Sequence, residues 1–198
     1  MSDKRNNGER EQCLEKKRDS SDNSQDSLVS RLKAADHAAA AELVDIYYQQ
    51  IFWFFRRMGH GCQVSEDLTQ ESFLAAWHHI SQLRDAKALN GWLYRIAANA
   101  SRLHWRRNKA RAHISSESQG IDVPDSSQSQ YEKIEQDEKL RQIKMAVEKL
   151  SVKRRQAVVL HYMQRLTIAE AAEAAGVREG TFKSRLNRAL NGLREMIG

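Results

Sequence analysis

The sequence predicts an all-α protein with two small helical domains joined by a flexible acidic linker. Pro occurs once and Gly nine times in 198 residues, whereas Ala, Leu, Gln, Glu, Lys and Arg, which favour helices, are frequent. Support for β-structure is correspondingly weak. Hydrophobic residues make up 40 % of the chain, which is enough for a buried core in one large or two small domains. The distribution of charge along the chain favours two small domains.

Charged residues fall into blocks that divide the chain. Residues 1–30 are polar with almost no apolar side chains, so we expect a disordered N-terminal extension. Residues 31–113 form the first predicted domain. Residues 114–138 form the linker, because they hold seven acidic residues, one Lys and the only Pro around a Ser/Gln-rich middle. Residues 139–198 form the second domain, with 13 basic against five acidic residues, and this excess suits a polyanionic partner.

The first domain is predicted to open with a helix from Asp36, which can serve as its N-cap, to Met58, before the Gly-His-Gly of residues 59–61. Apolar residues recur in this helix at steps of three and four, which is typical of a buried face: Leu43, Tyr47, Ile51, Phe54 and Met58.

We expect the second helix to be capped by Ser65 and to run through "EDLTQESFLAAWHHI". One side of it is mostly apolar: Thr69, Phe73, Ala76, Trp77 and Ile80. Another side is polar apart from one leucine: Asp67, Gln70, Glu71 and Leu74. Spacing alone favours a solvated face whose acids lie near the positive helix N-terminus.

The third helix, "DAKALNGWLYRIAANASRLHWRRNKARA", carries two parallel stripes. One is apolar and predicted to be buried: Leu89, Leu93, Ile96, Ala100 and Leu103. The other combines an aromatic ring, an amide and guanidinium groups: Trp92, Arg95, Asn99, Arg102 and Arg106. Such a stripe suits nucleic acid, because bases stack on rings and Arg pairs with phosphates or base edges. The alternative is a core Trp92 with solvated arginines, although no carboxylate lies between Ala86 and Ser116 to neutralise them.

The end of the second domain is predicted to be a helix-turn-helix. Thr167 and Glu170 match the capping box that starts a helix, and Gly176 supplies a left-handed residue to end it. The next helix has an apolar side consisting of Phe182, Leu186, Leu190 and Leu193. Its outer side is basic and polar: Arg178, Thr181, Lys183, Ser184, Asn187 and Arg188. A recognition helix of this kind enters the major groove of DNA.

Three stretches together carry a family resemblance: "SEDLTQESFLAAW", "LNGWLYRIAANASRLHWRR" and "RRQAVVLHYMQRLTIAEAAEAAGVREGTFKSRLNRALNGLR". They resemble the second and fourth conserved regions of bacterial RNA polymerase sigma factors of the extracytoplasmic-function (ECF) group in the sigma-70 family. The resemblance covers about residues 38–112 and 139–196, in the family's order and with a linker of the family's kind between them.

The resemblance implies roles for residues of this chain. The segment that docks on core RNA polymerase corresponds to Asp67, Gln70, Glu71 and Phe73. The helix that opens and holds the −10 promoter element corresponds to Trp92, Tyr94, Arg95, Asn99, Arg102, Trp105 and Arg106, and the loop at about Ser81–Leu89 corresponds to the one that receives a flipped base. The helix that reads the −35 element corresponds to Arg178, Thr181, Lys183, Ser184, Asn187 and Arg188. The expected partners are core polymerase, promoter DNA and an anti-sigma factor encoded by a neighbouring gene.

The sequence also indicates what this protein is not expected to be. No nucleophile–base pair or phosphate-binding Gly loop appears, so we expect no enzyme, no cofactor and no small-molecule substrate. Cys13 and Cys62 lie outside any metal-ligand spacing, so neither a metal site nor a structural disulfide is expected. The chain has no run of 18 apolar residues and no signal-peptide pattern, so we expect no membrane insertion and a cytoplasmic location.

Two alternative functions remain open at this point. An autonomous helix-turn-helix repressor or activator would explain the second domain but would leave the polar face of the second helix and the Trp92 stripe without a role. An adaptor that binds only proteins would keep the helices but leave the basic second domain unexplained. Binding to duplex DNA with and without core polymerase separates the repressor or activator from a sigma factor, because tight binding by the chain alone favours the former.

Overall fold

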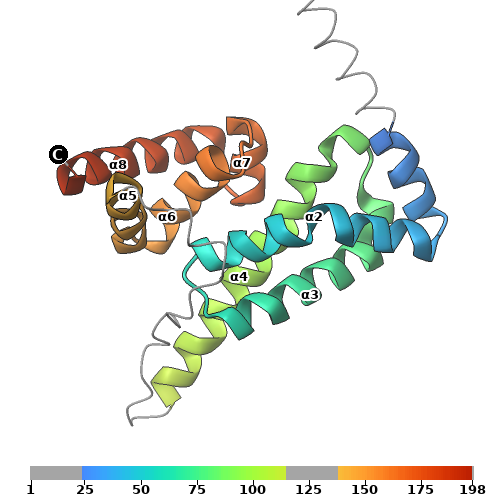
Figure 1. Ribbon diagram of the computed structural model, residues 1–198, viewed down its shortest axis with the longest axis horizontal. Helices are drawn as coiled ribbons and strands as arrows, with labels where there is room; N and C mark the ends of the chain where they lie inside the picture. The colour runs from blue at the N-terminus through green and yellow to red at the C-terminus, as the bar shows by residue number, and fades with distance from the viewer. Residues whose placement is uncertain (1–23, 115–137, 198) are drawn as a thin grey trace, which may run out of the picture.

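The computed structural model describes residues 24–114 and 138–197, and every regular element in these two ranges is helical (Figure 1). The all-α prediction is therefore confirmed. After helical residues 24–33 come α2 (His37–Arg57), α3 (Cys62–His79) and α4 (Leu89–Ile114). The second group comprises α5 (Glu138–Lys149), α6 (Val152–Val158), α7 (Ile168–Ala174) and α8 (Glu179–Ile197). Residues 1–23 and 115–137, which hold most of the predicted extension and linker, lie outside the described residues.

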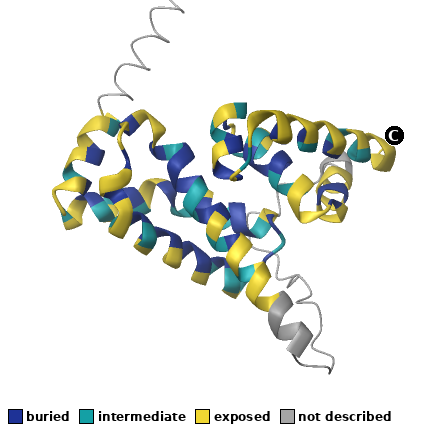
Figure 2. Cartoon of the chain, turned by 180° about the vertical axis from the view of Figure 1, so that it is seen from behind, coloured by how far each residue is buried: buried dark blue, intermediate teal, exposed yellow. Residues whose placement is uncertain are grey.

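The first group of helices is built on the predicted stripe of α2. All five of its residues are buried, and Phe54 lies edge-on to Tyr94 of α4, with ring centroids 5.7 Å apart. α2 packs against α3, and α3 packs against α4. Each large apolar side chain buried in this way contributes about 1.5–3 kcal/mol. The core of this domain therefore lies where the three helices meet, as the dark blue centre of Figure 2 shows.

The structure corrects the predicted N-terminal boundary. Residues 24–30 were expected to belong to the disordered extension, but they form most of a helix that ends at residue 33. Leu28, Val29 and Leu32 are buried, at a spacing that places them on one side of the helix. This short apolar stripe was masked by the polar residues around it, so composition averaged over 30 residues was misleading.

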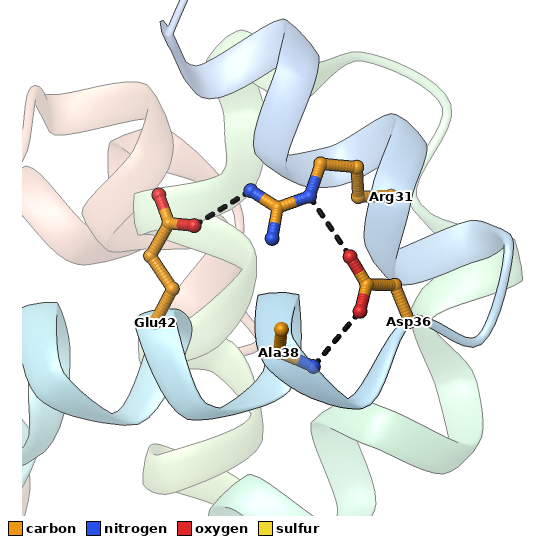
Figure 3. A network of polar contacts seen from close by, with 4 residues as sticks. All are labelled: Arg31, Asp36, Ala38 and Glu42. Carbon is orange, nitrogen blue, oxygen red and sulfur yellow. Dashed lines mark hydrogen bonds and ion pairs between the residues drawn. The ribbon is translucent and has the colours of Figure 1, made fainter.

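A polar network joins this short helix to α2 (Figure 3). Arg31 donates from Nε to Asp36 Oδ2 at 2.9 Å and from Nη1 to Glu42 Oε2 at 2.7 Å. Asp36 also accepts from the backbone N–H of Ala38, which makes it the N-cap of α2 as predicted. The Arg31 guanidinium, more than these backbone contacts, holds the pKa of the Asp36 carboxyl below its ordinary value.

The predicted start of α3 is wrong by one turn. The helix begins at Cys62 with Gly61 as its N-cap, and Ser65 lies inside it, fully buried. The Ser65 hydroxyl donates to the carbonyl of Gly61 at 2.8 Å, four residues back, instead of accepting from a backbone N–H. Ser in the first turn of a helix can make either bond, which is why sequence alone did not separate them.

The second group of helices is closed by the predicted helix-turn-helix. Thr167 and Glu170 form the capping box of α7, and Gly176 has a positive φ of 66° at its end. Phe182 and Leu186 of α8 are buried against this domain. Figure 1 shows α7 between α4 and α8, and α7 packs against both. The two groups of helices are therefore in contact through α4 and α7.

Candidate functional site

The polar face of α3 is largely as predicted. Asp67, Gln70, Glu71 and Leu74 are exposed. Phe73, the fourth residue assigned to polymerase docking, is only 9 % exposed and belongs to the core. Three of the four assigned side chains are thus available to a partner, and Phe73 supports the helix that presents them.

Two hollows flank this face, and the sequence analysis did not identify either. An apolar groove of about 460 Å³ lies between α2 and α3, with Tyr48, Gln70, Leu74 and Trp77 among its lining residues. A smaller cleft of about 130 Å³ lies between α3 and α4, where Asp67, Glu71, His104 and Arg107 line it together with apolar residues. The one available signal for the groove was Leu74, an apolar residue on an otherwise polar side.

The stripe of α4 is divided between core and solvent. Trp92 is only 5 % exposed and Tyr94 is buried as well, so the interpretation of Trp92 as a core residue describes this structure better than an open aromatic surface. Farther along the helix, four assigned residues are exposed: Asn99, Arg102, Trp105 and Arg106. Arg95 is intermediate, and Arg102 donates to the side-chain oxygen of Asn99.

Leu103 was predicted to be buried, but it is 43 % exposed. Leu103 lies at the open cleft between α3 and α4, near the C-terminal part of α4 that extends beyond the other helices of its domain in Figure 1. A face that is covered at Leu93 therefore has fewer neighbours ten residues later, although the periodic pattern continues. Helical periodicity identifies a face but not the length over which it is covered.

Trp105 has a supporting residue that the sequence analysis missed. The buried His60 ring lies 5.1 Å from the Trp105 ring between centroids, at an interplanar angle of 32°, and its Nε2 is 2.8 Å from Ser101 Oγ. Burial, with smaller repulsion from His104 and Arg155, lowers the pKa of His60 to about 3. Trp105 is thus backed by a neutral imidazole. The available signal was the histidine of the Gly-His-Gly stretch, which was interpreted only as a helix stop.

The six residues predicted for the recognition helix are all exposed, five on α8 and Arg178 directly before it: Arg178, Thr181, Lys183, Ser184, Asn187 and Arg188. Lys183 lies 3.6 Å from Glu179 on the preceding turn of the helix, so part of its charge is balanced within α8. Figure 2 shows the exposed side of α8 as a continuous strip along the helix. The sequence pattern therefore assigned the inner and outer sides of this helix correctly.

Side-chain hydrogen bonds between described residues join the two groups of helices. The Tyr94 hydroxyl donates to Gln164 Oε1 at 2.5 Å, and Arg95 Nη1 donates to Glu173 Oε1 at 3.1 Å. Arg155 Nη1 donates to the carbonyl of Met58 at 3.0 Å, at the end of α2. Two of the residues assigned to DNA, Tyr94 and Arg95, are therefore engaged by the second domain.

In a comparison with known proteins, both groups of helices match regions of one protein family. Sigma-70 region 2 matches residues 43–111, and Sigma-70, region 4 matches residues 140–192. The chain is 28 % identical over 180 residues to the ECF RNA polymerase sigma factor SigW of Bacillus subtilis, covering 85 % of this chain and 94 % of SigW. It is 30 % identical over 172 residues to the ECF RNA polymerase sigma factor SigM of Mycobacterium tuberculosis, covering 86 % of this chain and 83 % of SigM.

A solved structure has the same fold. The sigma factor RpoE of Bartonella quintana, crystallised with the anti-sigma factor NepR, superimposes with a TM-score of 0.62 at 24 % identity. The match covers 79 % of this chain and 94 % of that one. Within residues 24–114 and 138–197, no helix is both long enough and apolar enough to cross a membrane.

Proposed function

The chain belongs to the ECF sigma factors of the sigma-70 family, which direct core RNA polymerase to promoters, and on that premise we propose which surface performs each step. Recognition of two promoter elements and opening of the strands are binding steps, so we assign this chain no covalent chemistry and leave synthesis to the polymerase. Its place of action is then the cytoplasm, where polymerase and DNA are.

Core polymerase docks on the exposed face of α3 that contains Asp67, Gln70 and Glu71. The adjacent apolar groove, with Leu74 and Trp77 in its lining, supports this assignment, since it can accept an apolar side chain next to polar contacts. Phe73 forms part of the wall of the same groove. We therefore assign Phe73 to shaping the surface.

The −10 element is held by the partly exposed Arg95 and by four exposed residues farther along α4: Asn99, Arg102, Trp105 and Arg106. Trp105, at 37 % exposure and backed by His60, offers a ring on which an unpaired base can stack. The buried Trp92 and Tyr94 position the helix in this conformation. The −35 element is read by the outer side of α8 with Arg178 directly before it, where the six exposed polar residues suit the major groove.

The observation that carries this proposal is the pairing of an exposed acidic face on α3 with two exposed arginine-bearing faces on α4 and α8. A repressor needs only α8. If duplex DNA binds tightly to the chain alone and core polymerase adds nothing in a gel shift, the repressor is the correct interpretation. Promoter-specific transcription by reconstituted holoenzyme supports the sigma factor.

The docking face is tested by the double variant Asp67→Ala with Gln70→Ala. We expect lower recovery of core polymerase in co-purification and an unchanged circular dichroism spectrum, because both side chains are exposed. A matched control exists on α2, where Asp45→Ala with Gln49→Ala removes the same residue types from an exposed face. Equal recovery of both double variants would remove the assignment of α3.

An inhibitory partner is also proposed. The similar sigma factor RpoE was crystallised with the anti-sigma factor NepR, which supports an anti-sigma factor for this chain. The gene next to this one is the first candidate, and co-expression followed by loss of transcription from reconstituted holoenzyme is the test.

A further inference from the structure

A strained turn lies directly before the helix-turn-helix. It connects α6 and the π-helical turn that continues it (Val159–Met163) to α7. Arg165 in this turn has a φ of 56°, and among the described residues only Ala35 has a positive φ without being glycine. A left-handed backbone is costly for a residue with a Cβ. Because Arg165 is exposed, burial of its side chain does not offset this cost.

The backbone of the turn needs a left-handed residue at this position but does not need an arginine. The N–H of Gln164 donates to the carbonyl of Val159 at 2.9 Å, and the N–H of Leu166 donates to the carbonyl of Leu160 at 3.2 Å. These bonds close the helix end as in a Schellman motif, one residue wider because the preceding turn is π-helical. Glycine would make the same turn with less strain. The side chain of Arg165 is therefore the part that needs an explanation.

The turn presents Arg165 from a rigid support. His161 Nδ1 lies 2.8 Å from the carbonyl oxygen of Leu166, and the His161 ring lies edge-on to the Tyr162 ring, with centroids 4.8 Å apart. Leu166, directly after Arg165, is buried. A side chain that projects from a fixed backbone loses less conformational freedom when it binds a partner. The support therefore favours binding by Arg165.

The guanidinium of Arg165 is available to such a partner. None of the ion pairs between described residues includes it. The neighbouring surface is open as well, since Tyr162 is 55 % exposed and Thr167 is also exposed. Strained backbone positions are frequent at binding sites, where a contact to the ligand offsets their cost. An unpaired guanidinium in such a position suits an anionic ligand.

The place of Arg165 in the fold indicates which anion it meets. Arg165 lies three residues before Ile168, where α7 begins, and α7 is the first helix of the helix-turn-helix. In such motifs the first helix crosses the DNA backbone while the second lies in the major groove. With seven residues, α7 is only about 10 Å long, so the turn before it stays close to the DNA that α8 engages. Phosphate oxygens match the planar fork of a guanidinium.

We propose that Arg165 binds a phosphate of the DNA backbone beside the −35 element, from a turn that lies outside the recognition helix. This inference rests on the proposed reading of the −35 element by α8. The contact strengthens binding to every promoter sequence alike, because a phosphate carries no sequence information. Arg165 thus has a role different from that of Arg188, which is assigned to the choice of sequence.

Two variants separate the charge of Arg165 from its backbone. Arg165→Gly removes the guanidinium and relieves the left-handed strain, whereas Arg165→Ala removes the guanidinium and keeps the strain. Urea unfolding of the full chain should show that the Gly variant is more stable than the Ala variant. Holoenzyme with either variant should bind a labelled promoter roughly three- to tenfold more weakly, as expected for one exposed charge-assisted bond. The slope of log K against log salt concentration should become shallower by about one.

The control is Arg141→Ala, which removes the same charge from an exposed position of α5. Equal losses in both Arg165 variants, at every −35 sequence and with unchanged affinity for core polymerase, support the phosphate contact. A loss in only one of the two variants assigns the effect to the backbone and overturns the proposal, as does a Gly variant that is less stable than the Ala variant.

Three further results would also overturn the phosphate contact. A loss confined to one −35 position indicates base reading, a loss no larger than that of Arg141→Ala indicates net charge alone, and weaker binding to core polymerase indicates a protein contact. The proposed function fails in a different way, because wild-type holoenzyme would then show no −35 preference at all.

Discussion

The faces of α4 and α8 carry similar sequence signals but have different surroundings. Both show basic and polar residues at steps of three and four beside an apolar stripe. Every residue assigned to the α8 face is exposed. On α4, by contrast, Trp92 is buried in the core, Arg95 is paired with Glu173 of α7, and Asn99 is exposed. Periodicity therefore identifies the functional side of a helix, and long-range packing decides which residues on that side are accessible.

The largest expected effect tests the core position of Trp92. Replacing it with Ala should lower the free energy of unfolding by about 3–5 kcal/mol, because a buried indole is removed. Thermal and urea unfolding of the full chain measure this loss. A variant of normal stability that forms fewer open complexes would show instead that Trp92 contacts DNA, and would make the α4 face continuous like that of α8.

Acid should lower the stability of the folded chain, because the buried His60 must stay neutral in it. The pKa of His60 is lowered to about 3 in the folded chain, so below its ordinary value near 6.5 the unfolded chain binds more protons. The stability that depends on the neutral ring is complete above about pH 6.5 and is lost as the pH falls. The expected slope is about 1.4 kcal/mol per pH unit, or about 2 kcal/mol between pH 6.5 and pH 5.

His60→Gln is the control for this pH dependence, since it removes the titrating ring and retains a hydrogen-bonding group near Ser101. Urea unfolding at pH 6.5 and pH 5 should show a smaller difference in this variant than in the wild-type chain. An identical difference in both chains would assign the acid sensitivity to other groups and remove the neutral imidazole as a support for Trp105.

Local structure was the most predictable part of this chain. The Asp36 cap, the capping box of Thr167 and Glu170 and the two sides of α8 all depend on residues within a few positions of one another. The errors came from averaging and from tertiary packing. The apolar stripe that begins at Leu28 was lost in a polar average, and Leu103 follows the pattern of a face that is no longer covered.

The contact between α4 and α7 could not be predicted from pattern at all. Arg95 and Glu173 are 78 residues apart, and neither departs from the composition of an ordinary solvated helix face. The same applies to Arg155, whose basic character suits a DNA contact as well as it suits the Met58 carbonyl. Residues that join two domains carry no periodic signal, because their partners lie on a different helix.

Because the outer face of α8 is exposed, substitution of Arg188 should reduce the specificity for the −35 sequence. Arg188 is exposed, and a planar guanidinium can bind guanine with two hydrogen bonds. Arg188→Ala should therefore cost about 1–3 kcal/mol at one −35 position and leave the other positions unchanged. Selection of promoter variants by holoenzyme measures this preference. Retention of the wild-type preference at every position would make Arg188 a solvated residue.

The smallest effect is expected at Lys183, on the same face. Its ammonium is a flexible point charge that suits a phosphate, and its charge is already shared with Glu179 at 3.6 Å. Lys183→Ala should weaken promoter binding by less than about 1 kcal/mol for every sequence, with a shallower salt dependence. Titration of holoenzyme on a promoter at several salt concentrations measures both quantities.

The control for this prediction is Glu179→Gln, which frees Lys183 and should strengthen binding slightly. In the Lys183→Ala background it should have no such effect. If Glu179→Gln acts equally in both backgrounds, Lys183 does not contact phosphate, and the open face of α8 relies on Arg188 and its polar neighbours alone.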